Sequence, residues 1–97
     1  MPTYVALSNY TEQGIRTVKN GPARLNAVKK QFKAMGGELK AFYLTMGPYD
    51  IVTIVEAPDD ETAAAMSLAI GSGGNVRTVT MKAFDEAEFR RVVKTLP

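Results

Sequence analysis

The amino-acid sequence predicts an α+β domain of the ferredoxin-like type, with the order βαββαβ and an extra C-terminal helix. Two strand-like runs meet at a central turn, which indicates a β-hairpin. Apolar residues recur at helical spacing on both sides of that hairpin, and a strand-like run lies near each end of the chain. This pattern predicts a four-stranded antiparallel sheet with two helices on one face. With 97 residues, the chain is expected to form a single domain over residues 1–97.

The first half of the chain predicts a strand followed by an interrupted helical region. Residues 3–8 form the expected strand, and Thr11 is placed to cap a short helix over residues 12–19. The Gly21-Pro22 pair breaks that helix, because glycine costs a helix about 1 kcal/mol and proline donates no backbone hydrogen bond. A second helix is expected over residues 22–35. Its apolar stripe, expected to pack on the sheet, consists of Leu25, Val28, Phe32 and Met35.

The centre of the chain predicts the hairpin and a third helix. Strands are expected over residues 39–46 and 50–56, joined by the Gly47-Pro48 turn. The Asp59-Asp60 pair then offers a cap for an alanine-rich helix over residues 61–70. The small side chains of this helix favour a close approach to the sheet.

The last part of the chain predicts a fourth strand and a terminal helix. The strand is expected over residues 76–84, where threonines alternate with apolar residues. Asp85 and Glu88 have the spacing of a capping box, which marks the start of a helix. The apolar residues of that helix are Phe89, Val92, Val93 and Leu96.

Alternation along the strands divides their side chains into two sets. The set expected beneath the helices is large and apolar: Val5, Leu7, Phe42, Leu44, Met46, Val52, Ile54, Val79 and Met81. The opposite set mixes hydroxyls with aliphatic side chains: Tyr4, Ala6, Ser8, Ala41, Tyr43, Thr45, Ile51, Thr53, Val55, Val76, Thr78 and Thr80. Because this second face is too apolar to be solvated, we expect it to pack on a second copy, with a cavity between the sheets. A homo-oligomer formed through the open sheet face is therefore predicted.

The composition argues against several classes of function. The 12 basic and 10 acidic residues leave a net charge of +2 without a basic cluster, so no nucleic-acid partner is expected. The chain has no histidine and no cysteine, which removes imidazole bases, thiolate nucleophiles and the usual ligands of zinc and haem. No catalytic residue, metal site or cofactor is therefore predicted. Because the N-terminus lacks a signal-peptide pattern and no apolar run reaches ~20 residues, we expect a cytoplasmic protein without a membrane partner.

Four sequence segments carry a resemblance to a known family. They are Tyr-Thr-Glu-Gln-Gly at residues 10–14, Ala-Phe-Tyr-Leu-Thr-Met-Gly-Pro-Tyr-Asp at 41–50, Val-Glu-Ala-Pro-Asp-Asp-Glu at 55–61 and Gly-Asn-Val-Arg-Thr at 74–78. Over nearly its whole length the chain resembles the GYD-domain family of small bacterial proteins, whose biochemical function is not established. The Gly-Tyr-Asp label is interrupted by Pro48, so Gly47, Tyr49 and Asp50 carry it. The resemblance implies a dimeric α+β barrel and no catalytic residues, and the hairpin also resembles that of effector-binding domains in AsnC-type regulators.

Two groups of residues are candidates for a binding site. Tyr49 and Asp50 offer a phenol and a carboxylate to a ligand, but we favour a turn or strand-end role in which Asp50 accepts backbone amides. The second group consists of the hydroxyl-bearing residues assigned to the open face: Tyr4, Tyr43, Thr45, Thr53 and Thr80. These hydroxyls either line a cavity for a small organic ligand or satisfy one another in an interface between copies.

These features favour a non-catalytic, homo-oligomeric module that binds a small ligand or a protein partner in or near the cavity between two sheets. The alternative is a cofactor-independent enzyme, a monooxygenase or isomerase of the dimeric α+β barrel type. In such an enzyme a tyrosine or aspartate with a perturbed pKa supplies the acid–base chemistry. A DNA-binding regulator is disfavoured, because no helix-turn-helix accompanies the domain.

Overall fold

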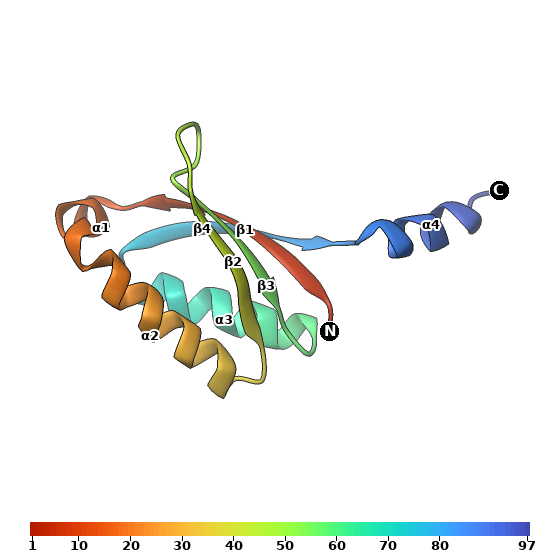
Figure 1. Cartoon of the computed structure of the whole chain (residues 1–97), viewed down its shortest axis with the longest axis horizontal. Coiled ribbons are helices and arrows are strands. Elements are labelled where there is room, and N and C mark those ends of the chain that lie inside the picture. The colour runs from red at the N-terminus through yellow and green to blue at the C-terminus, as the bar shows by residue number, and fades with distance from the viewer.

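A four-stranded antiparallel sheet with two helices on one face forms the body of the protein (Figure 1). The computed structural model describes all 97 residues. Its elements are β1 (Thr3–Tyr10), α1 (Glu12–Arg16), the 3-10 turn η1 (Val18–Asn20), α2 (Gly21–Ala34), β2 (Glu38–Leu44), β3 (Ile51–Glu56), α3 (Asp60–Ser72), β4 (Val76–Ala83) and α4 (Glu86–Lys94). The strand order is β2-β3-β1-β4, and every pairing is antiparallel. The predicted ferredoxin-like α+β fold is confirmed.

Side-chain caps start three of the helices as predicted. Thr11 caps α1 and Asp59 caps α3, each accepting the backbone N–H three residues later, at 3.0 and 2.7 Å. Asp85 and Glu88 form a reciprocal capping box at the start of α4, with bonds of 2.8 and 3.1 Å. The helix predicted over residues 12–19 is shorter than expected, because the chain tightens into η1 before α2 begins.

The helices cover the opposite face of β1, β3 and β4 from the one that the sequence analysis chose. Tyr4 and Ser8 of β1 are buried on the helix side, as are Ile51 and Val55 of β3. By alternation, the residues expected in the core lie on the open face instead: Val5, Leu7, Val52, Ile54, Val79 and Met81. The prediction was wrong because it ranked the faces by bulk and hydrophobicity, and in this sheet both faces are apolar.

A β-bulge in β2 changes the alternation within that strand. The register shifts directly after Leu39, so Leu39, Phe42 and Leu44 all line the helix side, whereas Tyr43 lies on the open face. Phe42 and Leu44 therefore face the helices as predicted, but next to different neighbours on β3. Met46 was expected in the core, yet it lies beyond the strand in the hairpin turn and is fully exposed.

The core lies between the sheet and the helices. Its buried cluster consists of Tyr4, Phe32, Val55, Ala57, Ala63 and Met66. The stripe predicted for α2 is confirmed, since Phe32 is buried and Val28 and Met35 pack against the cluster. Gly37 allows β2 to approach the core closely, because a Cβ at this position would overlap the Glu56 carbonyl oxygen and the Met66 methyl group.

The terminal helix α4 projects away from the body at the end of β4 (Figure 1). None of its residues is buried, and its apolar residues Phe89, Val92 and Val93 are exposed. The radius of gyration is 14.6 Å, compared with about 12.5 Å for a compact chain of this length. The predicted helix is present, but its apolar side has no cover within the chain. None of the helices combines the length and the hydrophobicity that crossing a membrane requires.

Candidate functional site

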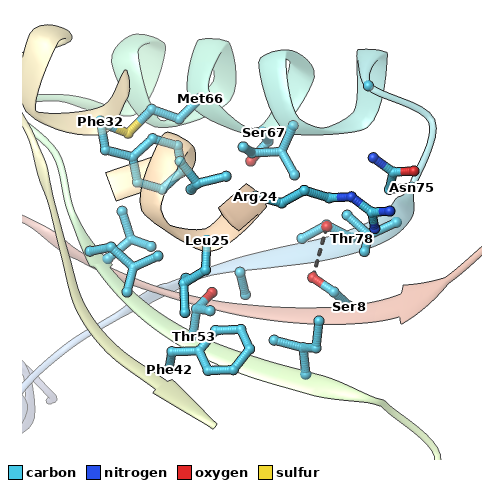
Figure 2. Close-up of a pocket in the computed structure, with 18 of the residues that line it drawn as sticks. Ser8, Arg24, Leu25, Phe32, Phe42, Thr53, Met66, Ser67, Asn75 and Thr78 are labelled. Atoms are coloured by element: carbon cyan, nitrogen blue, oxygen red, sulfur yellow. Dashed lines mark hydrogen bonds between the residues drawn. The ribbon is translucent and has the colours of Figure 1, made fainter. Parts of the chain in front are cut away.

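An apolar cleft of about 550 Å³ lies between the sheet and the two helices that cover it (Figure 2). We term it the helix–sheet cleft. Its floor includes side chains from every strand, among them Ala6, Ser8, Phe42, Thr53, Thr78 and Thr80. Its roof is formed by α2 and α3, mainly through Leu25, Val28, Phe32, Ala63, Met66 and Ile70. The volume and the mostly apolar lining are typical of a small-molecule site.

Two pairs of hydroxyl groups lie along this cleft. Ser8 Oγ and Thr78 Oγ1 are 2.9 Å apart on neighbouring strands (Figure 2). Ser67 Oγ of α3 and Thr80 Oγ1 are also 2.9 Å apart. Each pair uses one hydroxyl hydrogen for its internal bond and retains a second hydrogen that can be donated elsewhere. The covered face therefore contains satisfied hydroxyls that keep some hydrogen-bonding capacity.

Arg24 is the one charged side chain that lines the helix–sheet cleft. From α2 it points toward Thr78 and Asn75 (Figure 2). Its Nη2 donates to the backbone carbonyl of Thr17 at 2.7 Å and to the Thr17 hydroxyl. No carboxylate pairs with the guanidinium. Its Nη1 and Nε hydrogens are consequently free to bind an anion.

Tyr4 connects the cleft to a polar network at the surface. Its hydroxyl donates to Asp60 Oδ1, and Lys82 Nζ lies 3.1 Å from the same oxygen. The hydrogen bond to Asp60, together with burial, raises the pKa of Tyr4 to about 12. The bonds from Tyr4 and Lys82 hold the pKa of Asp60 below its ordinary value. At neutral pH this phenol is therefore protonated and acts as a hydrogen-bond donor.

Asp50 holds the central hairpin onto β1. Its Oδ2 accepts the backbone N–H of Tyr10 at 2.9 Å, and its own N–H donates to the carbonyl of Ser8 at 2.9 Å. The Thr45 N–H donates to the Asp50 carbonyl at 2.8 Å, and the Thr45 hydroxyl donates to the Tyr49 carbonyl at 2.6 Å. Asp50 thus occupies the strand-end role that the sequence favoured. A ligand-binding role for the hairpin stays a prediction.

The five hydroxyl residues assigned to the open face lie in three different places. Tyr4, Thr53 and Thr80 line the helix–sheet cleft. Tyr43 is exposed on the opposite face, and Thr45 lies in the hairpin just after β2. The structure does not bring these five residues together, because the predicted face was inverted for β1, β3 and β4 but not at Tyr43. Their role in binding stays a prediction.

Sequence reasoning missed Arg24 and Asn75 as cleft residues. The apolar stripe predicted for its helix does not include Arg24. The available signal was its spacing of four and eight residues from Val28 and Phe32, which places all three on one side of α2. Asn75 lies in a turn before β4, and no periodicity predicts its direction.

The uncovered face of the sheet carries two apolar rows, and we term it the open sheet face. The pairing register places Ala41, Ile54, Val5 and Met81 in one row and Tyr43, Val52, Leu7 and Val79 in the next. Each row crosses all four strands. Tyr43, Val79 and Met81 expose 59, 51 and 44% of their surface. Neither α2 nor α3 reaches this face (Figure 1).

Two of the segments that carry the family resemblance meet at one end of the sheet. The Thr11 N–H donates to the Asn75 carbonyl at 3.0 Å, and the Thr11 hydroxyl donates to the Gly74 carbonyl at 2.6 Å. Gln13 Nε2 donates to Asn75 Oδ1 at 3.1 Å. Gly14 lies so close that a Cβ there would overlap the Asn75 carbonyl oxygen. These contacts attach α1 to the turn between α3 and β4, which borders the cleft.

Comparison with known proteins identifies the family. The family model described as GYD domain matches residues 4–93. The chain belongs to the GYD domain family. A relative from Thermus thermophilus, named "Glutamine synthetase and cystathionine beta-lyase binding protein", is 37% identical over 89 residues, which are 91% of this chain and 94% of the relative. The crystal structure of TTHA0845 from Thermus thermophilus aligns with a TM-score of 0.57 and 25% identity over 88% of this chain and 95% of that one. The matched region of this GYD-domain protein includes the sheet except Thr3, and most of α4.

Proposed function

We propose that this GYD-domain protein is a non-catalytic, homo-oligomeric module that binds a protein partner. The observation that carries this proposal is the apolar surface left uncovered within the chain, on the open sheet face and on α4. Contiguous apolar surface of this kind usually marks an interaction site. The two surfaces lie on different elements, so they can serve two different interactions.

The open sheet face is proposed to pack on the same face of a second copy. Its two rows are almost entirely aliphatic, which suits sheet-on-sheet packing across a two-fold axis. Glu38 and Glu56 pair at one end of this face, where Lys40 Nζ lies 3.8 Å from Glu38 Oε2, whereas Arg77 lies at the other end. A two-fold axis perpendicular to the strands therefore brings the acidic end of one copy against the basic end of the other. This charge distribution supports a second copy as the occupant.

A protein partner is proposed from the name of the Thermus relative, which describes binding to glutamine synthetase and cystathionine β-lyase. We extend this role to the present chain and assign α4 as its docking surface. Self-association occupies the open sheet face, so the apolar side of α4 is the surface that stays free. An amphipathic helix that places its apolar side in a groove of the partner is a common recognition mode.

The test is capture of purified glutamine synthetase and cystathionine β-lyase from the same organism by the immobilised full-length chain. Phe89→Asp places a charge on the apolar side of α4 and is expected to weaken binding of the captured enzyme at least ~10-fold. Ala87→Asp adds the same charge two residues earlier, on the side of α4 opposite its apolar residues. This control variant is expected to leave binding unchanged. Both variants are expected to stay homo-oligomeric by sedimentation.

Three results would contradict parts of this proposal. If the wild type captures neither enzyme, the proposed partner is wrong. If Phe89→Asp and Ala87→Asp weaken binding of the enzyme equally, the apolar side of α4 is not the docking surface. Dissociation of the oligomer by Phe89→Asp would assign α4 to the contact between copies instead.

A further inference from the structure

We infer that the helix–sheet cleft binds a small amphipathic monoanion, with an apolar body and one carboxylate at its end. The cleft lies on the opposite side of the sheet from the proposed contact between copies. Binding there is thus independent of both the oligomer and the protein partner. The inference rests on the size of the cleft, its charge and its unused hydrogen-bond donors.

The size of the cleft indicates an occupant. Protein interiors are close-packed, and voids larger than a water molecule are few. A space of about 550 Å³ between the sheet and its covering helices is therefore more than a packing defect in a chain of 97 residues. Leu25, Phe32, Leu39, Met66 and Ile70 provide a wall of adaptable apolar side chains. Such a wall suits a hydrocarbon or aromatic body.

The charge in the cleft is of one sign. Among its 29 lining residues there is no aspartate, glutamate or lysine, and Arg24 is the single ionised group. Arg24 has no carboxylate partner within the chain. A lone guanidinium beside apolar walls favours one negative charge and disfavours a cation.

Unused donors gather where Arg24 points. The guanidinium retains its Nη1 and Nε hydrogens, because both of its bonds to Thr17 use Nη2. The Ser8–Thr78 pair retains one hydroxyl hydrogen. Asn75 accepts from Gln13 through Oδ1 and keeps its amide hydrogens. Figure 2 shows Arg24, Thr78, Ser8 and Asn75 in one part of the cleft, so a carboxylate there can accept from several of them.

Three probes of equal chain length separate charge from hydrophobicity. Octanoate, 1-octanol and octylammonium are titrated into the full-length protein, with calorimetry and amide chemical shifts as readouts. Octanoate is expected to bind at least ~10-fold more tightly than octanol, and octylammonium more weakly than octanol. The largest shift changes are expected at residues that line the cleft on the sheet, α2 and α3, and none on α4.

Two substitutions locate the binding site. Arg24→Gln is expected to weaken the binding of octanoate by about 10- to 100-fold and to leave the affinity for octanol unchanged, because only the anion binds the guanidinium. Lys29→Gln removes a charge from the exposed side of the same helix, outside the cleft, and serves as the matched control. Ala6→Leu fills the floor between Tyr4 and Ser8 and is expected to abolish binding of octanoate while the melting temperature holds or rises.

Several outcomes would overturn the inference. They are no binding of octanoate to the wild type, equal affinity for octanoate and octanol, or equal effects of Arg24→Gln and Lys29→Gln. If Ala6→Leu does not fold, the three probes and the Arg24 and Lys29 variants still decide the question.

Discussion

The two faces of the sheet differ in polarity and in how the chain covers them. The helix-covered face contains several hydroxyls, of which Ser8 and Thr78 pair with each other, and it borders a cleft that Arg24 of α2 also lines. The open sheet face has two aliphatic rows in which Tyr43 carries the single hydroxyl. The more apolar face is thus the one that the chain does not cover itself. The hydrophobicity of a sheet face therefore does not by itself indicate which face the chain's own helices cover.

The largest effect is expected at the centre of the covered face. Phe32→Ala removes a ring that is only 5% exposed within the core cluster. We expect a loss of about 3–5 kcal/mol in the free energy of unfolding, measured in urea. Phe89→Ala on α4, where the ring is 61% exposed, is the matched change and should cost less than about 1 kcal/mol. A loss below about 1 kcal/mol for Phe32→Ala would mean that this stripe does not hold α2 on the sheet.

Adjacent residues of β3 distinguish the two faces directly. Val52 belongs to the open sheet face and Thr53 lines the cleft. Val52→Asp is expected to dissociate the homo-oligomer, raising its dissociation constant at least ~100-fold, while the chain stays folded. Thr53→Asp is expected to leave the oligomer intact but to reduce the free energy of unfolding by about 1–3 kcal/mol.

Sedimentation of both β3 variants measures the oligomeric state, and urea unfolding measures the free energy of unfolding. A wild type that is monomeric at micromolar concentration would contradict the proposed contact between copies. Loss of the oligomer in Thr53→Asp and not in Val52→Asp would reverse the roles of the two faces.

Local signals predicted the elements well, because caps and turns act over a few residues. Thr11, Asp59 and the Asp85–Glu88 box start their helices as expected. The direction of each face could not be predicted in the same way. Alternation defines two sets of side chains, but it does not say which set the helices cover. The bulge after Leu39 also changes the alternation in β2, and no turn residue in this part of the sequence predicts it.

The candidate site was less predictable than the fold, because it is assembled from distant segments. Arg24 on α2, Ser8 on β1 and Asn75 before β4 meet only once the sheet has formed and its covered face is known. Asp50 was partly predictable. Its position at the end of a strand follows from the neighbouring Gly47-Pro48 turn, but its bonds to Tyr10 and Ser8 on β1 form only once the sheet has assembled.

A smaller effect is expected at the turn that borders the cleft. Gly14→Ala forces the Asn75 carbonyl to move, so we expect a loss of about 1–3 kcal/mol in the free energy of unfolding. Gly71→Ala in α3 meets no atom within 4 Å and is the control, with stability unchanged or slightly increased. The homo-oligomer should persist in both variants, since neither residue lies on the open sheet face. An unchanged stability for Gly14→Ala would show that α1 and this turn do not need to be in contact.

The smallest effect concerns the phenol of the covered face and depends on pH. The hydrogen bond to Asp60 raises the pKa of Tyr4 to about 12, from an ordinary value of 10.0. Because the folded-state pKa is the higher one, its contribution to stability is complete below about pH 10 and is lost as the pH rises toward about 12. In Tyr4→Phe this loss is absent. The difference in free energy of unfolding between wild type and Tyr4→Phe should therefore be constant near neutral pH and shift against the wild type between about pH 10 and 12. Other groups that titrate in alkali are common to both proteins, so urea unfolding at each pH isolates the phenol. A difference that does not change up to about pH 12 would mean that Asp60 does not hold this hydroxyl, and the covered face would lack one of the polar contacts that distinguish it from the open sheet face.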